Sequence, residues 1–283
     1  KLVDDAKDDL EKIYNIGISL IEGRKTFPIN TEVGIKYLEK SIEKGFIKAA
    51  IYSCTMLIKG KIISQNFKKA TKIAEKKLND EEGYQSLIMG KIEKQKQYLV
   101  KALNFFKKSI QLGNVDAIYE FGNMFYREDD KSDNVDLAIK FFQKAIEKGC
   151  VKAMCKYGMH LKYNEIDEEK GIQLIKMSAD KGYKKGCYIY SLMNRENPVQ
   201  YMKEASEKGH IESMLLYAMY LDNYEQNESF LKESKLLFKK ASDRGNFKAM
   251  YFYGMLFFNG KGVDINMQEA AKFLKIAAEN GNE

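Results

Sequence analysis

The hydrophobic and polar positions of this chain follow a pattern that recurs along its length. Phrases such as EKG, DKG, DRG and ENG end in a glycine, and a small residue usually stands four and nine positions later. A large apolar residue often follows three positions after the second small residue. Because successive helical residues are about 100° apart, these positions share one face of a helix. The second small positions are Gly17, Cys54, Gly90, Gly122, Gly158, Ser191, Ala218 and Gly254.

A second helix is predicted before each closing glycine. An aromatic or aliphatic anchor stands eight positions before the glycine, and a small residue often stands four positions before it. Asp or Asn opens several of these segments, as in DNVDLAIKFF and DINMQEAAKF, where a side-chain oxygen caps free amides. Asn197 followed by Pro198 is predicted to cap another such helix. The anchors are Tyr37, Ile73, Phe105, Phe141, Leu174, Tyr201, Leu237 and Phe273.

The two helices form a unit that repeats. The closing residues are most often 36 positions apart, and the spacing falls to 27 between Gly182 and Gly209. A regular period of this size is typical of helical repeat arrays. We therefore predict a single all-helical domain, residues 1–283, in which left-handed glycines end the second helices. The predicted units are 8–45, 46–81, 82–113, 114–149, 150–182, 183–209, 210–245 and 246–283.

Composition and charge narrow the class of protein. No apolar run reaches the roughly 18 residues that cross a bilayer, so no membrane insertion is expected. The 47 basic residues only slightly exceed the 40 acidic ones, which makes nucleic acid a poor candidate for a partner. The cysteines at 54, 150, 155 and 187 lack C-x-x-C spacing, which favours a reducing, cytoplasmic location. The ER lumen is the alternative if a signal peptide has been removed.

The last unit, KAMYFYGMLFFNGKGVDINMQEAAKFLKIAAENGN, resembles a Sel1-like repeat. The resemblance rests on Ala249, Gly254 and Phe257, on the NGKGV loop, and on the alanine-rich second helix that ends at Gly281. The other units resemble degenerate Sel1-like repeats, because most of them lack the G-x-G-V loop. The resemblance covers essentially the entire chain and implies a right-handed α-solenoid superhelix of about eight antiparallel helix pairs, related to tetratricopeptide arrays.

The resemblance also implies a function. Sel1-like proteins act as non-catalytic scaffolds or adaptors, so we expect protein or peptide partners on the concave surface. The alternative is a regulatory or targeting segment of a larger enzyme complex, such as ubiquitin-ligase or ER quality-control machinery or a kinase-linked protein. Secreted members carry a disulfide in every repeat, whereas the cysteines of this chain do not recur from unit to unit.

The first helix of each unit presents a face that is less polar than a solvated helix surface. One interpretation is that these side chains pack against neighbouring first helices, because a solenoid buries more of each helix than an isolated bundle does. The other is a groove rich in tyrosine and methionine that binds a helix or extended segment of a partner. The residues predicted to bind a partner are Tyr119, Met159, Tyr188, Leu192, Leu215, Met219, Tyr251 and Met255.

No catalytic pattern is evident, so we expect no enzymatic activity, no cofactor, no metal and no small-molecule substrate. The segment NGKGVD at 259–264 lacks the phosphate-loop frame G-x-x-x-x-G-K-[ST]. The acidic runs at 128–130 and 167–169 are predicted to be turns before helices rather than metal ligands. Cys155 and His160 lie five positions apart on one predicted helix and point about 140° apart, which excludes a nucleophile and base pair.

Overall fold

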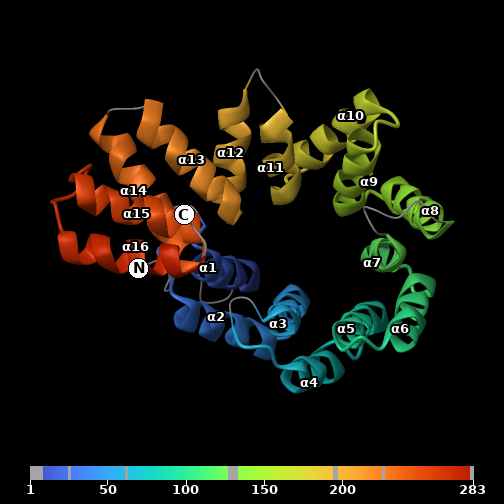
Figure 1. The fold of residues 1–283 in the computed structure, drawn as a ribbon. Coiled ribbons are helices and arrows are strands. Elements are labelled where there is room, and N and C mark those ends of the chain that lie inside the picture. The colour runs from blue at the N-terminus through green and yellow to red at the C-terminus, as the bar shows by residue number, and fades with distance from the viewer. Residues whose placement is uncertain are drawn as a thin grey trace. The chain divides into compact units, whose positions relative to one another are not determined.

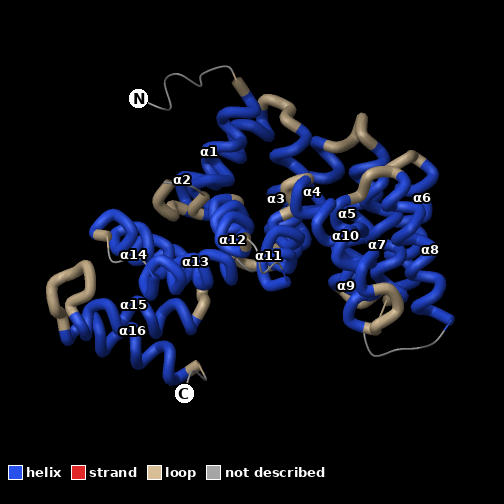
Figure 2. Tube along the Cα trace, turned by 90° about the horizontal axis from the view of Figure 1, so that it is seen from above, coloured by secondary structure: helices blue, strands red, loops and turns tan. Residues whose placement is uncertain are grey.

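The computed structural model describes residues 9–24, 27–60, 63–126, 133–193, 197–224 and 227–280. These residues form helices and loops, and no strand occurs among them (Figure 2). The chain forms two compact units. Unit 1 comprises residues 1–21 and 30–178, and unit 2 comprises residues 22–29 and 179–283.

Unit 1 contains the first ten helices, apart from the last residue of α1 and the end of α10. The helices follow one another in pairs along the chain (Figure 1). Their bounds are α1 (Leu10–Glu22), α2 (Thr31–Glu43), α3 (Ile47–Lys59), α4 (Phe67–Lys77), α5 (Glu82–Gln95), α6 (Leu99–Gln111), α7 (Val115–Phe125), α8 (Asp133–Glu147), α9 (Val151–Tyr163) and α10 (Glu168–Asp180).

Unit 2 contains six further helices, so that the described residues hold sixteen in all. They are α11 (Lys184–Met193), α12 (Pro198–Glu207), α13 (Ile211–Tyr224), α14 (Glu228–Asp243), α15 (Phe247–Asn259) and α16 (Met267–Glu279). Each of the eight predicted repeat ranges contains one helix pair. The shortest predicted range, 183–209, holds the two ten-residue helices α11 and α12. Within the described residues, no helix combines the length and the apolar composition that crossing a membrane requires.

Small residues bring the two helices of a pair into close contact. A Cβ on Gly158 of α9 would lie 2.7 Å from the carbonyl oxygen of Gly171 on α10, and a Cβ on Gly90 would lie 2.6 Å from the Phe106 ring. Both distances are too short for a side chain. The prediction that the recurring small position marks a close approach between helices is therefore confirmed at these positions.

Aromatic residues join the predicted anchors of the second helices. The Phe121 ring lies 4.6 Å from that of the anchor Phe141, and the Tyr253 ring lies 4.9 Å from that of the anchor Phe273. Tyr190 and the anchor Tyr201 make an edge-on contact at 4.8 Å. Offset and edge-on aromatic pairs are favourable beyond the area they bury. In these three helix pairs an aromatic residue of the first helix thus contacts the anchor of the second helix.

The closing glycines and the helix caps described below agree with the predictions from the sequence, except at Asn197. The closing glycines at 45, 113, 149, 182, 209 and 245 all have positive φ, as predicted, and Gly281 lies outside the described residues. The Asn266 side chain accepts hydrogen bonds from the backbone of Gln268 and Glu269 and caps α16. The cap predicted at Asn197 is wrong in detail. Its side-chain amide donates to Gln200 instead, and Pro198 opens α12 without a side-chain cap.

Candidate partner-binding surface

The residues predicted to bind a partner fall into three classes of exposure. Leu192 at the end of α11 and Tyr251 on α15 are exposed, at 54% and 40% of their surface. Both belong to unit 2. Tyr119, Met159, Tyr188, Met219 and Met255 are half-buried.

Leu215 does not belong to an accessible surface. Its side chain on α13 is only 7% exposed and lies in the hydrophobic core of unit 2 with Leu221, Phe238 and Leu256. For this residue the packing interpretation holds, because the neighbouring helices of the unit cover it. The inclusion of Leu215 among the accessible binding residues is therefore corrected.

The half-buried aromatic residues serve partly as packing. Tyr119 lies against Phe142 in unit 1 at a ring distance of 5.8 Å. Tyr188 lies against His210 in unit 2 at a ring distance of 4.6 Å. One face of each ring is thus held by the protein while part of the side chain stays accessible. An aromatic ring fixed in this way loses little conformational entropy when it contacts a partner.

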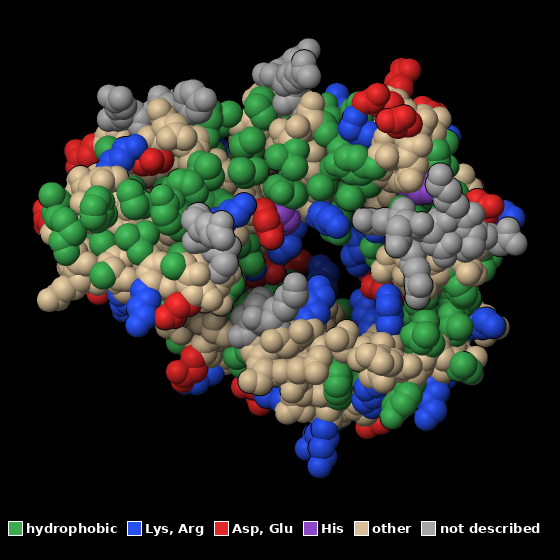
Figure 3. Space-filling view, viewed as in Figure 1, with side chains coloured by type: hydrophobic (Ala, Val, Ile, Leu, Met, Phe, Trp, Pro, Cys, Tyr) green, Lys and Arg blue, Asp and Glu red, His purple; other side chains and the backbone are tan. Residues whose placement is uncertain are grey.

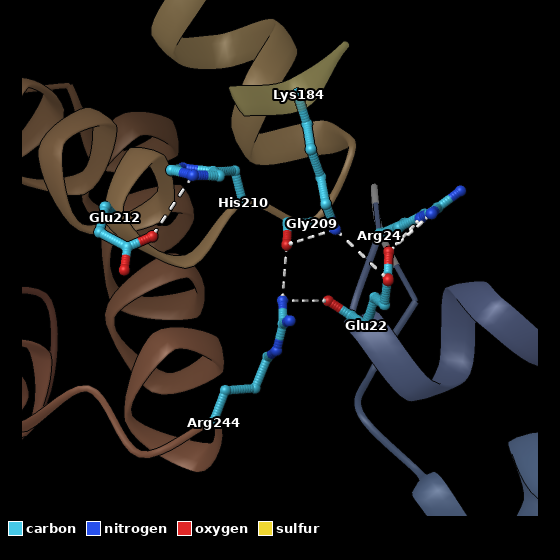
Figure 4. Close-up of polar contacts among 7 residues, drawn as sticks. All are labelled: Glu22, Arg24, Lys184, Gly209, His210, Glu212 and Arg244. Atoms are coloured by element: carbon cyan, nitrogen blue, oxygen red, sulfur yellow. Dashed lines mark hydrogen bonds and ion pairs between the residues drawn. The ribbon is translucent and has the colours of Figure 1, made fainter. Parts of the chain in front are cut away.

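A charged cluster in unit 2 lies next to Tyr188 and was not predicted from the sequence. The Glu22 side chain is 8% exposed, and its carboxylate accepts a hydrogen bond of 2.7 Å from Nε of Arg24 and contacts Nζ of Lys184 at 3.3 Å. Nη1 of Arg244 donates to the backbone carbonyls of Glu22, at 3.2 Å, and of Gly209, at 2.8 Å (Figure 4). These contacts hold Glu22 and Arg24 within unit 2.

Two basic residues in and beside the cluster, Lys184 and His210, have lowered pKa values. Desolvation lowers the pKa of Lys184, and the Glu22 carboxylate partly offsets that effect. Desolvation also lowers the pKa of His210 to about 4, against the opposing influence of Glu212, whose carboxylate lies 3.5 Å from Nε2 of the imidazole. His210 is therefore neutral near pH 7, and its Nδ1 accepts a hydrogen bond from the backbone of Ser213 at the start of α13.

The sequence carries only a weak signal for this cluster. Arg24 and Arg244 are two of only four arginines in the chain, and a rare residue that forms forked hydrogen bonds often has a specific partner. Their positions in the repeat are not equivalent, however, so no period relates them. The contacts of Lys184 and Arg244 join Glu22 to Gly209, so the cluster supports the packing of unit 2.

The cysteines and histidines do not assemble into a reactive site. All four cysteines are described, all are buried, and none forms a disulfide. Nδ1 of His160 lies 3.1 Å from the Tyr126 hydroxyl, and its ring packs edge-on against that tyrosine. The described residues contain no group of three or more histidine, cysteine or acidic side chains that would hold a metal ion. The acidic run at 128–130 lies outside those residues, whereas Asp167 caps α10 through the backbone of Lys170.

Comparison with known proteins identifies the class to which these helix pairs belong. The sequence model of the Sel1 repeat matches residues 13–46, 94–114, 115–150, 151–183 and 247–282. The matched segments make up more than half of the chain, and the chain belongs to the Sel1 repeat family. No curated protein matches the chain.

Solved structures show the same fold. A protective antigen of uropathogenic Escherichia coli, described as displaying an SLR fold, is 18% identical, with a TM-score of 0.58 over 98% of this chain and 63% of that one. The chain thus spans less than two thirds of the antigen's length. A Sel1 repeat protein from Oxalobacter formigenes is 20% identical, with a TM-score of 0.59 over 98% of this chain and 85% of that one. At these identities the similarity shows the fold alone.

Proposed function

We propose that this protein is a non-catalytic scaffold that binds partner proteins or peptides through the first helices of its repeats. The strongest support is the exposure of Leu192 and Tyr251, two large apolar side chains on first helices of unit 2. The Sel1 repeat fold commonly serves as a protein-interaction scaffold, which supports the same function.

The side chains around these two residues suit an adaptable contact. Met219 and Met255 are half-buried, so part of each flexible residue is accessible. Tyr188 is held by His210 and presents a ring of fixed orientation. Tyrosine and methionine are enriched in the centres of protein interfaces. We propose the corresponding half-buried residues of unit 1, Tyr119 and Met159, as a smaller part of the same function.

We also propose a cytoplasmic location. The four cysteines are buried thiols that form no disulfide, although cysteines of secreted repeat proteins are usually paired. Their burial would protect them from chance oxidation, since reactivity follows exposure and thiolate character. Fluorescence microscopy of a tagged full-length protein in its host tests the location. Accumulation in a secretory compartment would contradict it.

The proposed binding surface is tested by affinity capture from a native extract, followed by quantitative mass spectrometry. The test variant carries Leu192→Glu and Tyr251→Glu, whose side chains are exposed, so the fold should be retained. The matched control carries Leu236→Glu on α14 and Met267→Glu on α16, which are 40% and 56% exposed and give the same change in charge. Circular dichroism and thermal unfolding establish that both variants are folded.

The proposal expects a defined set of captured proteins to disappear from the test variant and to remain with the control. If the two variants lose the same proteins, the loss is caused by the added negative charge, and Leu192 and Tyr251 are not part of a specific binding surface. If neither variant loses any protein, the first helices of unit 2 are not the binding surface.

A further inference from the structure

A second surface of unit 1 has the features of a docking groove. The helices α5 and α6 enclose an open groove of about 600 Å³. Met89 and Phe105, both half-buried, are its apolar residues. Its polar lining comes from Glu93, Lys101, Asn104 and Lys108. The groove is therefore an apolar depression with two exposed lysines at its border.

An exposed apolar segment continues this groove at the start of α6. Tyr98, Leu99 and Val100 are consecutive and exposed, and Val100 reaches 73%. The Lys101 ammonium, which lines the groove, lies 5.4 Å from the centre of the Tyr98 ring, so the segment adjoins the groove. Three large apolar residues in a row at the surface are unusual unless something covers them. The groove and this segment together provide an apolar strip on the surface of unit 1.

Lysines outnumber acidic residues around the strip. The second helices α4 and α6 carry eight lysines and one acidic residue, Glu75, whereas α5 contributes Glu93 to the lining, where it is paired with Lys96 at 3.3 Å. Two of the lysines are partly neutralised by exposed ion pairs, Lys69 with Glu39 at 3.1 Å and Lys108 with Glu82 at 3.3 Å. Lys and hydrophobic side chains lie interspersed over the part of unit 1 that holds α4 to α6 (Figure 3). The surface is thus complementary to an occupant that is both acidic and apolar.

We propose that the α5/α6 groove binds an acidic amphipathic segment of a partner protein. Large apolar side chains of that segment occupy the depression formed by Met89 and Phe105 and cover Tyr98 and Leu99. Its carboxylates pair with Lys101 and Lys108 at the border. A helix whose apolar residues recur every three or four positions fits a groove that runs along α6, in the manner of other helix-in-groove complexes. This surface is formed by the first helix α5 together with the second helix α6, and it contains none of the residues proposed above as the partner-binding surface.

The groove fits a protein segment better than it fits an anionic membrane or a nucleic acid. A bilayer is flat and offers no side chain that fills a depression of this size. Nucleic acid would pair its phosphates with lysines, but it would leave the apolar groove without a partner. Base stacking uses several aromatic faces interleaved with the charges, whereas at this site Tyr98 is the exposed ring beside a lysine and Phe105 is half-buried within the groove. Only a polypeptide supplies carboxylates and large apolar groups together at the required spacing.

The test uses three labelled synthetic peptides of about 18 residues, five turns of helix, and the full-length protein. The first peptide has leucine on one face and glutamate on the other. The second replaces every glutamate with lysine, and the third replaces every leucine with alanine. Binding is followed by fluorescence anisotropy. An oligothymidine and vesicles containing phosphatidylserine serve as the competing classes of ligand.

Two charge-matched variants locate the site. Lys101→Glu with Lys108→Glu changes the border of the groove. Lys68→Glu with Lys76→Glu makes the same change at exposed positions of α4 that do not line it. A third variant, Tyr98→Ser, removes an exposed ring next to the groove without a change in charge. Circular dichroism and thermal unfolding confirm that each variant retains its fold.

We expect the acidic amphipathic peptide to bind saturably, and the other two peptides to bind at least about tenfold more weakly. The groove variant should weaken binding about tenfold or more, and Tyr98→Ser severalfold, while the α4 control changes it less than about threefold. The proposal is overturned if the α4 control weakens binding as much as the groove variant. It is also overturned if the acidic amphipathic peptide does not bind, or if the oligothymidine or the vesicles bind more tightly than it does.

Discussion

The carboxylate of Glu22 lies 3.3 Å from the ammonium of Lys184, although 162 positions separate the two residues in the chain. Arg24 approaches the same carboxylate to 2.6 Å. Glu22 is buried, and these ion pairs and hydrogen bonds compensate for its lost hydration. A buried charge that loses its partners is costly even where the intact pair contributes little net stability.

Neutralising this carboxylate should therefore destabilise the fold. We expect Glu22→Gln to lower the free energy of unfolding by about 1–3 kcal/mol, less than for a fully buried pair because Lys184 is partly exposed. Urea-induced unfolding followed by circular dichroism measures the change. The control Glu32→Gln removes the exposed pair with Lys36 and should leave stability nearly unchanged. Equal effects in the two variants would contradict the importance of burial.

The lowered pKa of His210 predicts a pH dependence. The unfolded chain binds a proton at His210 near pH 6.5, whereas desolvation and the charges of Lys184, Arg244 and Lys185 hold the folded pKa at about 4, despite the nearby Glu212. The contribution of His210 to the free energy of unfolding is fully present above about pH 6.5. It decreases as the pH falls toward 4, by at most about 3 kcal/mol. Urea unfolding at several pH values in that window measures the decrease.

The variant His210→Asn isolates this contribution. Asparagine cannot be protonated in the relevant range and can still accept a hydrogen bond from the backbone at the start of α13. We expect the difference in stability between about pH 7 and about pH 5 to be smaller in this variant than in the parent protein. An unchanged difference would assign the pH dependence to other groups, such as the carboxylates.

Glycine within a helix is required where the neighbouring helix approaches too closely for a Cβ. Gly158→Ala should destabilise the fold by about 1–3 kcal/mol, because the added Cβ would meet the Gly171 carbonyl at 2.7 Å. Gly83 on α5 has no atom nearer than 3.6 Å to such a Cβ, and Gly83→Ala should stabilise by up to about 1 kcal/mol. Thermal unfolding of the two variants distinguishes them, and a stabilising Gly158→Ala would disprove the close-contact explanation.

Leu215 and Leu192 belong to the same predicted surface and should respond differently to truncation. Leu215→Ala removes a core side chain and should cost about 2–4 kcal/mol. Leu192→Ala removes an exposed side chain and should change stability by less than about 0.5 kcal/mol. Urea unfolding measures both values. A similar cost for the two variants would show that Leu192 is packed.

The cysteines should be unreactive while the protein is folded. Burial raises the pKa of Cys54 to about 12 and that of Cys187 to about 11, so the reactive thiolate is scarce near neutral pH. We expect Ellman's reagent to label neither thiol in the native protein and to label all four cysteines in denaturant. Mass spectrometry after alkylation assigns each site. Rapid native labelling of Cys54 or Cys187 would contradict this prediction.

The repeat pattern in the sequence determined the helix pairs. The 3.6-residue period, the left-handed closing glycines and the capping residues act over one or two turns, so they can be read locally. Helix pairs also form in the range 46–81 and in the range 210–245, which the family model does not match, because the spacing of small and apolar residues persists there. The fold class could therefore be predicted, and the arrangement of all pairs as one continuous domain stays a prediction.

Tertiary structure alone decided which apolar positions are covered and which charges meet. Leu215 and Tyr251 occupy the same position of the repeat, yet one is core and the other exposed, because coverage depends on the helices packed around each residue. The pairing of Glu22 with Lys184 joins positions with no periodic relation. Contacts over such distances depend on how the chain folds back on itself, and a single sequence contains no local signal for them.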